Sequence, residues 1–176
     1  MGDIHHVWSH RWLTPTAEVR NSKIHGTGVF AKSPIKKGEV VFVAGGVVVP
    51  VLDYEKYRKI TGATTIGVQI NERFFICPSS LDEVTINGAI NHSCNPNLGV
   101  SDSITMIVMR DITTGEELTI DYSFYETLME PFECNCGARV CRKNITKNDW
   151  KIKKLQRKYG KYFSSYLKRR FIRRYQ

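Results

Sequence analysis

The sequence is first informative for what it lacks. None of its apolar runs approaches the roughly 18 residues needed to cross a membrane. The N-terminal stretch MGDIHHVWSHRW has no apolar core of the kind found in secretory signals. Internal repeats and low-complexity linkers are also missing. We therefore expect an intracellular protein with no membrane partner. With 41% hydrophobic residues, the 176-residue chain is long enough for one domain with a buried core.

Cysteine is scarce, with five in the chain. Without a secretory signal, disulfides are not expected and a metal site is the better explanation, with unmetallated thiols as the alternative. Cys134, Cys136 and Cys141 lie together in CNCGARVC. Zinc prefers four ligands, so a distant thiol must supply the fourth. Cys77 lies in the apolar stretch RFFICP, where a buried free cysteine is ordinary. Cys94 lies in a polar loop, where a thiolate is easier to aim, and we favour it.

Acidic residues are almost absent from the C-terminal part. Between residues 143 and 176 there are thirteen Lys or Arg and one acid, Asp149, which gives a net charge of +12. The whole chain carries +9, so residues 1–142 sum to −3. A basic tail of this kind fits nucleic acid or another anionic surface. The solvated face of a helix explains it equally well.

Short β-branched runs separated by turn residues dominate the chain from residue 17 to about 124. The exceptions are a short helix or turn expected at residues 53–60 and a short helical turn after residue 79. From Thr146 the apolar period changes to that of a helix. Thr146 and Asp149 resemble a capping box, and Gly160 is placed to end the helix. A second helix is expected from Ser164 or Ser165. The pattern predicts a mainly β or α+β domain with a helical C-terminus.

Three further stretches carry polar chemistry. The glycines of GTG, at Gly26 and Gly28, allow a ligand to approach the backbone closely, although a plain tight turn is the simpler interpretation. GEELTIDY carries several acids, which suit acid–base chemistry or a hard cation but equally an exposed strand. NHSCNPN, residues 91–97, packs amides, an imidazole, a hydroxyl and a thiol into one loop that suits neither helix nor strand.

Four motifs, taken in order, resemble a SET-domain protein-lysine methyltransferase with a post-SET zinc module. They are HGTGVFA, NHSCNPN, GEELTIDY and the C-x-C-x4-C cluster followed by CRKNI. The resemblance runs from about Val19 to Ile145. A cysteine-rich pre-SET segment is missing, and the tail NDWKIKKLQRKYGKYFSSYL is similar to those of compact microbial members. The resemblance implies a mainly β, β-clip-like fold of several small sheets with a helical C-terminal segment. It implies an N-terminal extension at 1–16, a SET domain at 17–126, a post-SET zinc module at 127–146 and a basic helical tail at 147–176.

The family transfers a methyl group from S-adenosylmethionine to a lysine ε-amine, so the resemblance also implies site residues. The catalytic residue is Tyr122. The cofactor-binding residues are Gly26, Thr27, Gly28, Val29, Phe30, Asn91, His92 and Tyr122. The zinc ligands are Cys94, Cys134, Cys136 and Cys141. The expected wall of the substrate channel comprises Ile120, Phe124 and Tyr125.

Several of these residues have a second interpretation. Ile120 stands where many members carry Phe or Tyr, so we expect room for a second or third methyl group. Phe124, Tyr125 and Phe132 either wall the lysine channel, cover the adenine or simply pack in the core. The acids Glu116, Glu117 and Asp121 are expected to be structural or electrostatic.

The expected partner is a protein or peptide substrate that carries a lysine, with nucleic acid as a further partner of the basic tail. The compartment is expected to be cytoplasmic or nuclear, or the nucleoid of a prokaryote. A different class of function is the alternative: a zinc-stabilised nucleic-acid or chromatin-binding module that has lost transferase activity.

Overall fold

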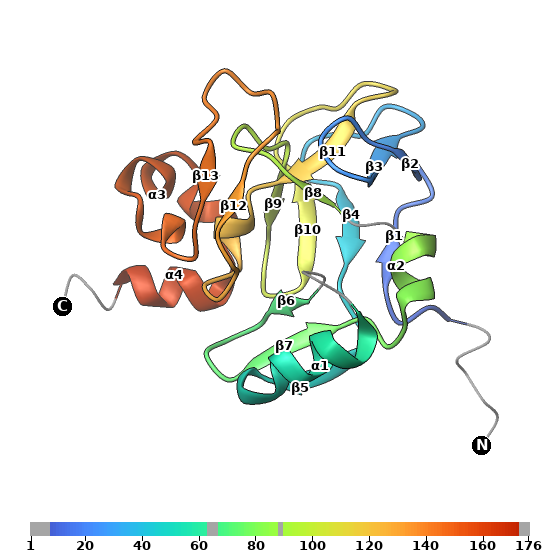
Figure 1. Ribbon diagram of the computed structural model, residues 1–176. Helices are drawn as coiled ribbons and strands as arrows, with labels where there is room; N and C mark the ends of the chain where they lie inside the picture. Colours follow the sequence, from blue (N-terminus) through green and yellow to red (C-terminus); the bar gives the residue numbers. More distant parts are fainter. Residues whose placement is uncertain (1–7, 63–66, 88–89, 173–176) are drawn as a thin grey trace.

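The computed structural model describes residues 8–62, 67–87 and 90–172, and their strands form three sheets. Figure 1 shows that the helices α3 (Lys153–Tyr159) and α4 (Ser165–Ile172) lie together at one side of these sheets. The expected architecture, several small sheets with a helical C-terminal segment, is confirmed. No described helix has both the length and the apolar character required to span a membrane.

The largest sheet has eight strands, and one of them, β11 (Glu117–Ile120), pairs with three others. β11 is antiparallel to β3 (Thr27–Ala31) but parallel to β8 (Asn91–His92) and β9 (Leu98–Val100). The remaining strands are β10 (Thr105–Val108), β4 (Val40–Val43), β1 (Trp12–Leu13) and β2 (Ala17–Asn21). β1 pairs with β4, so part of the segment expected to be an N-terminal extension belongs to this sheet.

A second sheet joins β5 (Val47–Pro50), β7 (Phe74–Cys77) and β6 (Val68–Gln69). The 3-10 turn η2 (Val51–Asp53) and helix α1 (Tyr54–Thr61) pack on it, and α2 (Leu81–Asn87) follows β7 (Figure 1). The ring of Tyr54 stacks on that of Phe75 at a centroid distance of 3.9 Å. Cys77 is fully buried in the same small core, as expected. The predicted helix at residues 53–60 is confirmed.

The C-terminal part begins with η3 (Tyr122–Phe124) and a two-stranded sheet of β12 (Phe132–Glu133) and β13 (Asn144–Ile145). The Thr146 hydroxyl donates to Asp149 Oδ1 at 2.8 Å, but Asp149 is the first residue of the 3-10 turn η4 (Asp149–Lys151), and neither η4 nor α3 has a side-chain cap. α3 begins after η4 and leads through η5 (Gly160–Tyr162) into α4, which starts at Ser165 as predicted.

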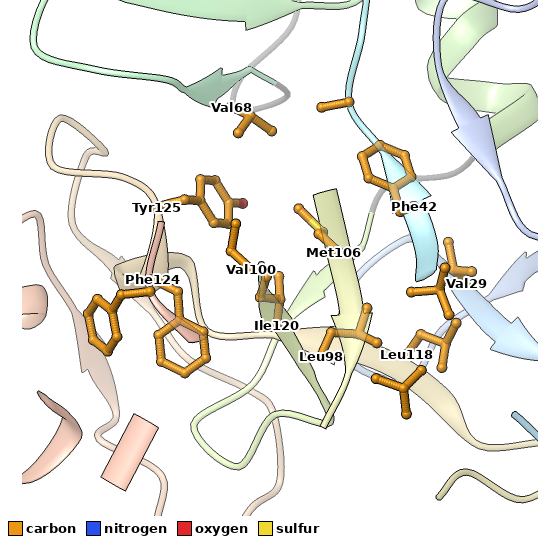
Figure 2. Close-up of a cluster of buried hydrophobic side chains, with 14 of the residues drawn as sticks. Val29, Phe42, Val68, Leu98, Val100, Met106, Leu118, Ile120, Phe124 and Tyr125 are labelled. Carbon is orange, nitrogen blue, oxygen red and sulfur yellow. The ribbon is translucent and has the colours of Figure 1, made fainter. Parts of the chain in front are cut away.

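The main core gathers side chains of the large sheet, several of which Figure 2 labels, and it also includes side chains of the C-terminal helices. Phe124 is fully buried, with its ring centroid 5.3 Å from that of Tyr159 and 4.8 Å from that of Phe163. Of the three roles suggested for it, the structure therefore supports packing in the core. Gly99 in β9 is required here, because a Cβ at this position would lie 2.6 Å from the ring of Tyr162.

Candidate active site

The polar loop 91–97 is held against the end of β11. Asn91 and His92 pair in parallel with Thr119 and Ile120. The Asn97 side-chain oxygen accepts from the Thr119 N–H at 2.8 Å, and the Asn97 N–H donates back to the Thr119 oxygen at 3.1 Å. Hydrogen bonds that the loop cannot make internally are thus supplied by a strand more than twenty residues later. The two motifs NHSCNPN and GEELTIDY therefore form one unit.

His92 links the backbone of Tyr122 to a cysteine. Its Nδ1 accepts from the Tyr122 N–H at 3.2 Å, which places the ring proton on Nε2, and Nε2 lies 3.5 Å from Cys94 Sγ. Burial lowers the pKa of His92 to about 4, although nearby Asp121 opposes the shift. The imidazole is therefore neutral near pH 7 and orients its neighbours through hydrogen bonds.

The side chain of Tyr122 is half-buried, and its hydroxyl donates to the Ile90 oxygen at 3.0 Å. Burial, aided by the nearby carboxyl of Glu126, raises the pKa of Tyr122 above its ordinary value. The phenol is therefore protonated at neutral pH. Because its proton is already directed to a carbonyl, the lone pairs of its oxygen are left to accept from a donor in the site.

Asn91, His92 and Tyr122 line a pocket of about 350 Å³, which is within the size range of small-molecule sites. The ring of Phe132, a residue with several suggested roles, lies in the wall with its centroid 5.6 Å from that of His92. Sequence reasoning missed the rest of the wall. The additional lining residues include Ile24, His25, Arg58, Glu130 and Asn135.

The residues that line the pocket next to the glycine-rich segment are Ile24 and His25, which directly precede it. Gly26, Thr27, Gly28, Val29 and Phe30, expected to bind cofactor, are not among the described residues that line it. Val29 is fully buried in the main core, and the ring of Phe30 lies 4.1 Å from the guanidinium of Arg20.

What the segment contacts is the side chain of Asn91. Asn91 Nδ2 donates to Glu117 Oε1 at 2.8 Å and to the Thr27 oxygen at 3.1 Å. A Cβ on Gly28 would lie 2.2 Å from the same Glu117 oxygen, so a larger residue here would displace the carboxylate that accepts from Asn91. The glycine motif thus sets the position of the preceding pair Ile24 and His25.

The four cysteines expected to bind zinc come together. Their sulfur atoms all lie within 4.8 Å of one another, and those of Cys94 and Cys134 are 3.9 Å apart. Sulfurs placed ~2.3 Å from a zinc ion at tetrahedral corners would be about 3.8 Å apart, so the donor set fits this ion. Backbone N–H groups of Arg142 and Lys143 point at Cys94 and Cys141, as expected for thiolates. Burial raises the pKa of Cys94 to about 11, so a bound cation is needed to keep it ionised.

An ion pair that the sequence did not reveal ties this cluster to Tyr122. Arg142 follows the last cysteine and forms a bidentate pair with Asp121, at 2.6 and 2.9 Å. Its Nε also donates to Asp149 at 2.8 Å. Asp121 is fully buried and accepts from the Ser123 hydroxyl as well. The residue before Tyr122 is thereby fixed to both the cysteine module and the C-terminal tail.

The chain belongs to the SET-domain family, whose model matches residues 26–123. It is 34% identical to human histone-lysine N-methyltransferase 2B over 71% of its own length, and 32% identical to Arabidopsis thaliana histone H3-lysine(4) N-trimethyltransferase ATX1 over 69%. The chain spans only 5% and 12% of the length of these two relatives.

Solved structures agree on the fold. KRYPTONITE in complex with mCHG DNA and SAH matches 73% of this chain and 28% of its own, with a TM-score of 0.55 and 27% identity. The methyltransferase domain of human SETMAR matches 74% of this chain and 58% of its own, with a TM-score of 0.60 and 22% identity.

Proposed function

We propose that this protein transfers a methyl group from S-adenosylmethionine to the ε-amine of a lysine in a protein substrate. The observation that carries the proposal is the meeting of Asn91, His92 and Tyr122 in one pocket, in a chain of the SET-domain family. Relatives named histone-lysine methyltransferases support it, as does a structural neighbour solved with SAH. Histones are therefore the first substrate class to test, and an intracellular, nuclear location would follow from them.

The pocket residues suit such a cofactor. S-adenosylmethionine supplies, when bound, a methyl group on a positively charged sulfur. Asn91 and His92 offer amide and imidazole groups from the strand β8, and Phe132 offers a ring face. The four cysteines hold zinc in this proposal. One of them, Cys134, lines the same pocket, so the metal would fix the wall against which the cofactor binds.

The transfer requires an unprotonated amine held in line with the methyl group. A free lysine has a pKa near 10.4 and is charged at pH 7. A dry channel beside a sulfonium charge lowers that pKa by desolvation and like-charge repulsion. The oxygen of Tyr122 then accepts from the amine and orients it, so that positioning supplies much of the rate.

In this proposal the number of methyl groups transferred depends on the wall of the lysine channel, where the family resemblance puts Ile120 and Tyr125. Ile120 is fully buried and aliphatic, and the ring centroid of Tyr125 lies 6.0 Å from that of Tyr122. We propose that the small side chain at position 120 admits di- or trimethylation. Mass spectrometry that finds only monomethyl-lysine with excess enzyme contradicts this.

A thermal shift with S-adenosylhomocysteine tests the cofactor site, because a ligand bound by the folded state alone raises its stability. Labelled S-adenosylmethionine added with histone octamers, or with cell extract followed by site mapping, tests transfer. In Tyr122→Phe the amine loses an acceptor, and we expect transfer to fall about 10²-fold or more while the thermal shift remains. Full activity of this variant on every substrate found would falsify the mechanism.

Nucleic-acid binding is a second candidate function, compatible with the first. Arg73, Arg169 and Arg170 line a hollow of about 590 Å³ between the β6–β7 turn and α4, together with Tyr166. The basic tail supports the same partner. If phosphates bind there, affinity for duplex DNA falls steeply with salt, and Arg169→Gln reduces the slope of log affinity against log salt by about one. Salt-independent affinity contradicts this function. Intact Asn91, His92 and Tyr122 argue against a module that has lost transfer.

A further inference from the structure

Glu126 is a buried acid that forms no ion pair within the described part of the chain. Its side chain is 4% exposed, and its Oε1 has no hydrogen-bond partner among the described residues. Its position is nevertheless fixed on both sides. The backbone N–H of Glu126 donates to the backbone carbonyl oxygen of Tyr122 at 3.0 Å. The next residue, Thr127, donates from its N–H and its hydroxyl to the side chain of Gln69. These bonds fix the backbone that carries the carboxyl group.

The titratable groups that interact electrostatically with this carboxyl group come from three elements. They are Tyr54 and Arg58 of α1, Cys77 of β7, and Tyr122 and Tyr125 from the segment after β11. Burial raises the pKa of Glu126 to about 8, and Arg58 opposes the shift only in part. Arg58 instead lies 3.4 Å from Glu55 and lines the cofactor pocket.

Stability does not explain such a residue. A neutral amide or apolar side chain of similar size would fill the same space without the desolvation penalty of a buried charge. Lone buried acids with displaced pKa values are typical of functional sites. A cation that arrives from outside would satisfy the unpartnered oxygen. The only cation that the proposed reaction brings to Tyr122 from the substrate side is a lysine ammonium.

We propose that Glu126 receives the ε-ammonium group of the substrate lysine beside Tyr122 and takes one proton from it. This inference rests on the proposed methyl transfer. The ammonium and the carboxylate become a neutral amine and a carboxylic acid. The amine nitrogen then forms a bond to the methyl carbon as the carbon–sulfur bond breaks, which leaves a methylated ammonium and a neutral thioether. After product leaves, Glu126 releases its proton to water that enters the channel.

The test uses n-butylammonium as a probe of the lysine side chain, so that no protein substrate is needed. Its binding to the full chain saturated with S-adenosylhomocysteine is followed by NMR titration, with sodium chloride keeping the ionic strength constant. Glu126→Gln is compared with wild type, and Glu18→Gln, an exposed acid on β2, is the matched control. We expect wild type and the control to bind at pH 8.5. Affinity should fall at least tenfold at pH 6.5, because ionisation drops about tenfold for each unit below the pKa.

In Glu126→Gln we expect at least tenfold weaker binding at pH 8.5 and no dependence on pH. Equal binding by this variant, or pH-independent binding by wild type, overturns the role of Glu126. If Glu126→Gln does not fold, Glu126→Asp keeps the charge on a shorter arm and must retain the pH dependence. The thermal shift with S-adenosylhomocysteine is measured on the same samples. If wild type shows no thermal shift with S-adenosylhomocysteine, the result counts against the proposed function. The butylammonium titration, repeated without S-adenosylhomocysteine, still tests the role of Glu126.

Discussion

At the scale of single residues, the ion pair between Asp121 and Arg142 has the greatest consequence. Asp121 is fully buried and directly precedes Tyr122, while Arg142 directly follows the last cysteine. A buried pair contributes little net stability when intact, but removing one partner leaves an uncompensated charge. The position of Tyr122 therefore depends on a residue that belongs to the cysteine module.

Arg142→Met should lower the free energy of unfolding by about 3–5 kcal/mol, because Asp121 loses its bidentate partner inside the protein. Urea denaturation measures the change. Arg139→Met, at an exposed position of the same module, should stay within about 0.5 kcal/mol of wild type. Adding Asp121→Asn to Arg142→Met should restore part of the loss. A loss below about 1 kcal/mol for Arg142→Met would show that Asp121 finds another partner.

Glu126 makes stability depend on pH in a direction that can be checked. Its pKa is raised from 4.5 to about 8 in the folded protein. Its contribution to the free energy of unfolding is therefore fully present below pH 4.5, where the carboxyl group is protonated. The contribution is lost as the pH rises toward 8, by roughly 1.4 kcal/mol for each unit by which folding raises the pKa. Urea denaturation should show that, between pH 5 and 8, the free energy of unfolding of Glu126→Gln increases relative to that of wild type. A constant difference across that range would mean that the carboxyl group is solvated.

At the scale of elements, the four thiols join the loop 91–97, which β11 holds, to a region with little regular structure of its own. The loop 91–97 supplies Cys94, and the region between β12 and β13 supplies the other three. β12 and β13 have only two residues each, too short to hold their own geometry. The proposed metal would therefore determine how this region closes over the cofactor pocket.

Metal removal should consequently open the pocket. We expect one zinc per chain in natively purified protein, and chelation should lower the melting temperature and abolish the shift with S-adenosylhomocysteine. Cys94→Ser should reproduce the loss, since a three-thiol site binds zinc far more weakly. Cys77→Ser, which alters a thiol outside the cluster, should keep the full zinc content measured by elemental analysis. Natively purified protein without zinc would contradict the proposed metal site.

Helices and strands with a clear local pattern of apolar residues could be predicted from the sequence. Contacts between residues that lie far apart in the sequence could not. α1, β10 and the start of α4 follow from periodicity, and Cys94 follows from the polarity of its loop. The pair of Asp121 with Arg142 spans 21 residues, and no local pattern connects them. Phe124 had a second plausible role, because the docking site of the C-terminal helices depends on packing. Glu126 resembles any exposed acid until the fold buries it.

At the scale of the whole molecule, the basic tail is also part of the core. Phe163 and Leu167 are fully buried in the main hydrophobic cluster, although residues 143–176 carry 13 of the 26 Lys and Arg residues of the chain. One face of this segment thus stabilises the domain, and the opposite face remains available to an anionic partner. A tail that merely extended from the domain would unfold without affecting the site.

Leu167→Ala distinguishes these two cases. Because the side chain is fully buried, we expect the free energy of unfolding to fall by about 2–5 kcal/mol in one cooperative transition. Lys154→Ala, at an exposed position on α3, should have almost no effect. Phe163 contacts Phe124, which belongs to η3 with Tyr122, so Leu167→Ala should also weaken binding of S-adenosylhomocysteine near the melting temperature. Two separate transitions, with ligand affecting only one, would show that the tail folds independently of the site.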